Sequence, residues 1–94
     1  MDKLVECRNL IDEIDTEIIK LFEKRMDVVK DVTKYKIENN KPILDSSREH
    51  AMLEKNLTKI QNEEYKAYYI DVLQGFLKAS KTMQETLIIE NSKK

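Results

Sequence analysis

An almost unbroken helical pattern over residues 4–38 constrains the fold of this chain more than any other feature. Apolar side chains recur there in steps of three and four residues, which is the spacing of one face of an α-helix. They occupy positions 4, 7, 11, 14, 18, 21, 22, 28, 29 and 32. A helix of ~35 residues is roughly 50 Å long, whereas a compact domain of this size is only about 25–30 Å across. We therefore expect an obligate dimer, in which a second copy of the chain buries part of this face.

The end of this first helix and the start of a second are marked by a short polar segment. The chain has one glycine and one proline among its 94 residues, which is too few turn residues for a β architecture. The segment ENNKPILD ends the first helix, since Pro42 disfavours helical backbone at Lys41. The second helix is expected to open at DSSRE, where Ser46 is the expected N-cap and has capping-box spacing to Glu49. Its predicted buried side consists of Glu49, Met52, Leu53, Leu57 and Ile60.

A third helix is predicted from about Glu63 to Ile89, after a break at QNEE. Gly75 lies inside this helix at a cost of ~1 kcal/mol relative to alanine, which suggests that another helix crosses closely there. The sequence therefore predicts an all-α fold, with a single domain over residues 1–94 and a long, a short and a second long helix. The apolar stripe of the third helix consists of Tyr65, Tyr69, Val72, Leu73, Phe76, Leu77, Met83 and Leu87.

The composition argues against several classes of function. Hydrophobic residues make up 40% of the chain and charged residues 37%, which is typical of a soluble globular domain. A net charge of −1 argues against a nucleic-acid partner, which would require a basic excess. The N-terminus MDKLVECRNL has no signal-peptide core, and no apolar run is long enough for a membrane span. Cys7 is the only cysteine, so no internal disulfide can form and we expect a cytoplasmic protein.

The familiar catalytic and metal-binding patterns are missing from the sequence. No residues have the spacing of a metal site, a phosphate-binding loop or a Ser/His/Asp triad. We therefore expect neither a metal nor a cofactor. His50, the only histidine, is expected to be exposed to solvent, and Cys7 to be a small buried apolar residue rather than a nucleophile.

Two cationic residues interrupt the apolar face of the first helix. Positions 4, 11 and 18 are apolar and form a series with a period of seven, but the next member is Arg25. A neighbouring series through positions 22 and 29 ends at Lys36. Arg25 and Lys36 share a helix face about 16 Å apart along the axis, so two long side chains could lean over a small anion. A buried cation is costly unless it is paired.

Other polar residues share the expected interior. Ser80 and Gln84 lie one turn apart and continue the stripe of the third helix. Arg48 and Glu49 begin the second helix beside its buried edge, and Arg8 flanks the face of the first helix. Together these residues predict a pocket for an anion.

Five of these residues also have a simpler interpretation. Arg25 could fix the register of an oligomer, and Lys36 could favour the helix dipole or reach water. Glu49 could be no more than a capping residue, and Ser80 and Gln84 could be polar residues tolerated at a helix edge.

Five short motifs follow one another along nearly the whole chain. They are R-x2-I-D-x-I-D from Arg8, L-x3-R ending at Arg25, V-x3-K ending at Lys36, P-I-x-D-x2-R-E ending at Glu49, and S-x3-Q ending at Gln84. In this order and spacing they resemble the all-helical chorismate mutases. The resemblance implies an intertwined homodimer of three-helix chains with two equivalent active sites. It also implies the conversion of chorismate to prephenate, a 3,3-sigmatropic (Claisen) rearrangement on the route to phenylalanine and tyrosine.

The resemblance assigns a role to each matched residue. Arg8 of the partner chain and Arg25 of the home chain would each bind a substrate carboxylate. Lys36 would contact a carboxylate and the ether oxygen, and Gln84 would donate a second hydrogen bond to that oxygen. The ring hydroxyl and the pocket wall would be lined by Asp45, Arg48 and Glu49, and Ser80 would assist a carboxylate.

Three alternatives stay open at this point. The first is an isochorismate pyruvate-lyase on the same fold. The second is a non-catalytic dimerisation module, in which Arg25 and Lys36 form interhelical ion pairs. The third is a regulatory domain of a larger fusion, although the initial Met1 and a C-terminal NSKK that is expected to fray favour a free-standing enzyme.

Overall fold

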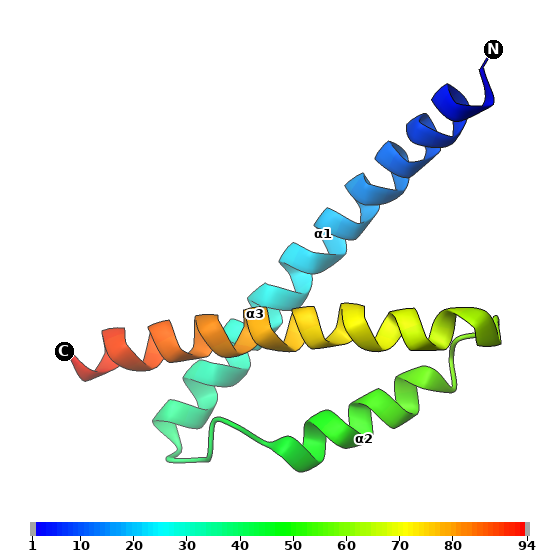
Figure 1. Cartoon of the computed structure of the whole chain (residues 1–94). Coiled ribbons are helices and arrows are strands. Elements are labelled where there is room, and N and C mark those ends of the chain that lie inside the picture. Colours follow the sequence, from blue (N-terminus) through cyan, green and yellow to red (C-terminus); the bar gives the residue numbers. More distant parts are fainter. Residues whose placement is uncertain (1, 94) are drawn as a thin grey trace.

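The structure, a computed structural model, describes residues 2–93 and shows three α-helices and no strand within them (Figure 1). Helix α1 spans Lys3–Glu38, α2 spans Ser46–Leu57 and α3 spans Lys66–Ser92. A short 3₁₀ turn, η1, spans Glu63–Tyr65 and leads into α3. The predicted all-α fold, with a long, a short and a second long helix, is confirmed.

Local hydrogen bonds close α1 at both ends. Asp2 accepts a hydrogen bond at 3.0 Å from the backbone N–H two residues further on. At the other end Asn40 has a φ of 53°, and the backbone N–H of Lys41 bonds to the carbonyl of Lys36 at 2.8 Å. This left-handed closure is a Schellman turn, with asparagine where glycine is commoner. Together with Pro42 it ends α1 where the sequence predicts.

The N-cap of α2 lies one residue before the predicted one. The N-cap is Asp45 rather than Ser46, and its carboxylate accepts a hydrogen bond from the backbone N–H of Arg48 at 3.0 Å. A carboxylate at this position also favours the positive end of the helix dipole. The predicted inner side of α2 is half-buried throughout, and its last member lies beyond the end of the helix: Glu49, Met52, Leu53, Leu57 and Ile60.

Helix α3 begins three residues later than predicted, because the side chain of Asn62 caps the turn η1 instead. Within the predicted stripe Leu73 is buried, whereas Tyr65 and Val72 are more than half exposed. No other helix of the same chain crosses closely at Gly75, because a methyl group there would meet no atom of another element within 4 Å. The helix runs on to Ser92, so the end of the chain is helical further than expected. Met1 and Lys94 lie outside the described residues.

The small core lies where α1 crosses α3. Its buried residues within the described range are Thr33, Leu73 and Ser80. The hydroxyl of Thr33 donates to the carbonyl of Val29 at 2.8 Å, so this buried polar group is satisfied within its own helix. The radius of gyration is 17.1 Å, well above the roughly 12 Å of a compact domain of this length.

The N-terminal half of α1 explains this elongated shape. In Figure 1 it projects away from α2 and α3 as a free rod. Contiguous apolar surface on a protein usually marks an interaction site. We call its exposed large apolar residues the apolar arm: Leu4, Val5, Leu10, Ile11, Ile14, Ile18, Ile19 and Leu21.

None of the helices within residues 2–93 combines the length and the apolar character that crossing a membrane requires.

Candidate active site

A cavity of about 340 Å³ lies between the C-terminal half of α1, the start of α2 and the middle of α3. That volume is within the range of small-molecule sites. Its apolar wall consists of Val28, Val29, Val32, Ile43, Leu44, Met52 and Leu77. Seven of the eight candidate residues from the sequence also line it: Arg25, Lys36, Asp45, Arg48, Glu49, Ser80 and Gln84.

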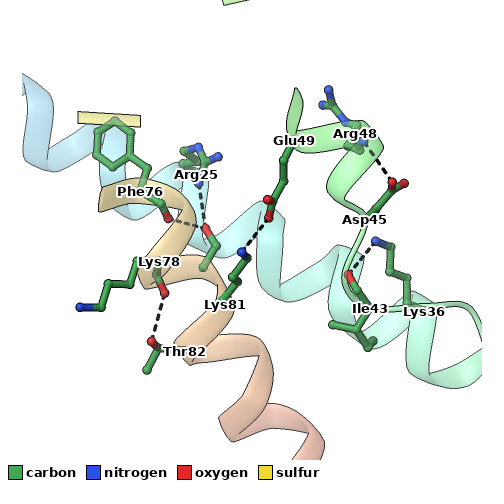
Figure 2. Close-up of polar contacts among 11 residues, drawn as sticks. Arg25, Lys36, Ile43, Asp45, Arg48, Glu49, Phe76, Lys78, Lys81 and Thr82 are labelled. Atoms are coloured by element: carbon green, nitrogen blue, oxygen red, sulfur yellow. Dashed lines mark hydrogen bonds and ion pairs between the residues drawn. The ribbon is translucent and has the colours of Figure 1, made fainter. Parts of the chain in front are cut away.

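Arg25 reaches the cavity from α1 and is held by α3 (Figure 2). Its guanidinium donates a hydrogen bond to the hydroxyl of Ser80 at 2.9 Å. The same guanidinium lies 5.7 Å from the centre of the Phe76 ring, within the range of a cation–π interaction. Ser80 is buried and itself donates to the carbonyl of Phe76 at 2.9 Å. The cation is therefore fixed by two contacts from the facing helix.

Lys36 is brought to the cavity by the turn that ends α1. The Schellman turn folds the chain back, so that the ammonium of Lys36 donates to the carbonyl of Ile43 at 3.3 Å (Figure 2). The side chain is half-buried. Because an ammonium has three donors, this bond leaves two of them for a ligand.

The start of α2 supplies the charged rim of the cavity. Asp45 uses a carboxylate oxygen to cap the helix, and Arg48, one turn on, is exposed. Glu49 is half-buried and pairs with Lys81 of α3 at 3.5 Å, which ties the two helices together across the rim (Figure 2). Gln84, one turn further along α3 than Ser80, is half-buried.

Charge and shape together restrict what this cavity can bind. Its lining carries four cations, from Arg25, Lys36, Arg48 and Lys81, and two carboxylates. Two positive charges are therefore in excess, although the whole chain has a net charge of −1. The rest of the wall around these charged side chains is mainly apolar. The arrangement suits a small ligand that has an apolar body and two negative charges.

Arg8 is the candidate residue that does not join the others. It lies exposed on the projecting half of α1 and is absent from the cavity lining. Seventeen residues of helix separate it from Arg25, which is about 25 Å along the axis. Within a single chain, Arg8 and Arg25 therefore cannot both contact the same small ligand.

Lys81 lines the cavity but was not predicted from the sequence. A lysine on an amphipathic helix is normally a solvent-exposed residue, so Lys81 does not stand out by residue type. Its position between Ser80 and Gln84 was the available signal. The ion pair with Glu49 joins residues 32 positions apart, so only the packing of α2 on α3 reveals it.

The remaining candidates lie elsewhere. His50 is exposed, as predicted, and pairs with Glu54 at 3.1 Å. Cys7 is half-buried on α1 rather than fully buried. Among residues 2–93 no three His, Cys, Asp or Glu side chains gather into a possible metal site.

Comparison with known proteins shows which family the chain resembles. The family model described as chorismate mutase type II matches residues 7–85. A chorismate mutase of Methanocaldococcus jannaschii is 32% identical over the whole chain and 96% of its own length. The T-protein of Haemophilus influenzae is 37% identical over 85% of this chain. A bifunctional chorismate mutase/prephenate dehydratase of Buchnera aphidicola is 43% identical over 63% of it.

The relatives differ in how much of their length the chain covers. It spans only 22% of the T-protein and 16% of the bifunctional Buchnera protein, but nearly all of the Methanocaldococcus protein. No solved structure matches the chain with significance. All eight candidate residues fall within the segment that the family model matches. The chain therefore belongs to the chorismate mutase type II family.

Proposed function

We propose that the cavity binds chorismate and isomerises it to prephenate. The observation that carries the proposal is a small, apolar-walled cavity with two excess positive charges in a chain of this family. Chorismate has a hydrocarbon ring with one hydroxyl, and carries one carboxylate on the ring and one on its enolpyruvyl arm, so its charge and shape match the lining. The name of the Methanocaldococcus relative supports the same activity.

The chemistry of this rearrangement explains why cationic side chains and a neutral amide are sufficient for catalysis. In the rearrangement the ether C–O bond breaks as a C–C bond forms within the same molecule, so no nucleophile attacks and no proton moves. Negative charge builds on the ether oxygen because C–O cleavage runs ahead of C–C formation. Fixed donors aimed at that oxygen stabilise the transition state more than the substrate, typically by about 3–4 kcal/mol each. In this proposal Lys36 and Gln84 are those donors.

The other lining residues hold the reacting conformer. Arg25 binds a carboxylate, while Asp45, Arg48 and Glu49 surround the ring hydroxyl and Ser80 assists at a carboxylate. The apolar wall confines the enolpyruvyl arm over the ring. Confinement of this kind lowers the barrier because the entropy of orienting the reacting atoms is lost on binding.

We infer that the active form is a homodimer in which Arg8 comes from the partner chain. The exposed apolar arm supports this inference, because such a surface on an isolated chain would favour association. The position of Arg8 on that arm, too far from the cavity of its own chain, supports it further. The cytoplasm is the proposed compartment, in line with the single free Cys7.

The direct test is the loss of chorismate absorbance when purified protein is added. The wild-type protein should consume chorismate and form prephenate. Lys36→Ala should lower kcat by at least about 100-fold, with helicity retained by circular dichroism. The matched control is Lys34→Ala, since Lys34 is an exposed lysine of the same helix outside the cavity lining; its turnover should stay within about twofold of wild type.

Two outcomes would contradict the proposal. A Lys36→Ala protein with near-normal turnover would show that the cavity is not where the chemistry happens. A wild-type protein that leaves chorismate unchanged but releases pyruvate from isochorismate would assign the lyase activity instead.

A further inference from the structure

The guanidinium of Arg25 is held both by a hydrogen bond to Ser80 and by the ring of Phe76. Ser80 donates its single hydroxyl proton to the carbonyl of Phe76, so its lone pairs face the N–H of Arg25. The Phe76 ring lies 5.7 Å from the guanidinium carbon. Both contacts come from one turn of α3, and Figure 2 shows the Phe76 ring beside the guanidinium of Arg25.

The ring of Phe76 is itself supported from α1. It stacks on Phe22 with the centroids 6.2 Å apart and an angle of 28° between the planes. Phe22 precedes Arg25 by three residues, so the two lie on the same face of α1. The crossing of α1 and α3 therefore builds a platform in which Phe22 supports Phe76 and Phe76 faces Arg25.

We propose that Phe76 is a positioning residue, whose aromatic face holds the guanidinium of Arg25 in the orientation that binds a substrate carboxylate. The inference rests on the proposed function, in which Arg25 is a carboxylate ligand. A free arginine side chain has several rotatable bonds, and ordering them on binding lowers affinity. The ring and Ser80 order the side chain beforehand and leave its other donors for a planar, two-point grip.

This role predicts a particular kinetic signature. A carboxylate contact is present in both the bound substrate and the transition state, so weakening it raises KM and changes kcat little. A general disturbance of the fold would lower kcat and stability instead. The aromatic face, rather than apolar volume, is what the proposal requires, so tyrosine should replace phenylalanine whereas leucine should not.

The experiment compares Phe76→Leu, Phe76→Tyr and the matched control Tyr69→Leu. Phe76→Leu should raise KM for chorismate about five- to tenfold with kcat within about twofold, and Phe76→Tyr should retain wild-type KM. Tyr69→Leu removes a half-buried ring of the same helix that lies outside the cavity lining. It should lower stability in urea comparably and leave KM within about twofold. If Phe76→Leu does not fold, Phe76→Met takes its place with the same expectation.

A second readout does not depend on turnover. Nitrogen NMR of the guanidinium should show slow rotation of Arg25 about its terminal C–N bonds in wild type and Phe76→Tyr, and fast rotation in Phe76→Leu. Wild-type KM and slow rotation in Phe76→Leu would overturn the proposal, as would an equal rise of KM in all three variants. A wild-type protein inactive on chorismate would refute the proposed function alone, because the NMR comparison would still decide the role of Phe76.

Discussion

The amide of Gln84 can donate a hydrogen bond without first gaining a proton. This property of a single residue matters because the proposed reaction needs a hydrogen-bond donor at the ether oxygen and needs neither an acid nor a base. Gln84 lines the cavity from α3 and is half-buried. A neutral donor at this position should leave kcat/KM nearly constant between mildly acidic and mildly alkaline pH.

Replacing the amide by a carboxyl should make the activity depend on pH. In Gln84→Glu the new group donates only when protonated, and its ordinary pKa is about 4.3. The cations of the lining favour its ionised form. Activity should therefore be low at neutral pH and rise as the pH falls towards that pKa, measured as kcat/KM against pH. Gln74→Glu, on the same helix but outside this cavity, is the control and should keep the flat profile; a flat profile in Gln84→Glu would contradict the assigned role.

At the scale of the element, Asp45 connects the start of α2 to the cavity. Its carboxylate caps the helix, and the residue also lines the site. Asp45→Ala should lower the free energy of unfolding by about 1 kcal/mol, since the first turn loses its acceptor. Asp45→Asn keeps an acceptor and should lose only a few tenths of a kcal/mol. Urea unfolding at a fixed protein concentration measures both, and equal losses in the two variants would show that the cap is not what Asp45 contributes.

The elements themselves could largely be predicted from the sequence, because their signals are local. The apolar period and the ENNKPILD break set the bounds of α1 to within one residue. Ser46 was wrong as the cap because Asp45, Ser46 and Ser47 are all good capping residues, and the local sequence does not rank them. The start of α3 was missed because a 3₁₀ turn and an α-helix share nearly the same local pattern.

Contacts that depend on the packing between helices were harder to predict from the sequence. The cavity residues could be proposed from polar positions on apolar faces, but the Glu49–Lys81 pair and the Phe76 contact with Arg25 appear only once α2 and α1 are placed on α3. Val72 is exposed although it belongs to the predicted stripe. An apolar period shows that a face is to be covered, not whether its own chain or another one covers it.

The whole molecule raises the question of how Arg8 could reach a site at all. Arg8 and Arg25 are seventeen residues apart on one helix, about 25 Å along the axis and roughly 100° around it. Antiparallel pairing of two α1 helices through the apolar arm would bring Arg8 of each chain towards Arg25 of the other. Two-fold symmetry would then create this arrangement twice. Each active site would contain one arginine from each chain.

Mixing two inactive variants tests this shared site. Arg8→Ala and Arg25→Ala should each be nearly inactive, alone or after unfolding and refolding. When they are unfolded and refolded together, random pairing makes about half of the dimers mixed. Each mixed dimer has one site with both arginines and one with neither, so about a quarter of wild-type activity should return. If Arg8 instead served the site of its own chain, every site in the mixture would lack one arginine. No recovery, with mixed dimers shown by mass spectrometry to form, would rule the shared site out.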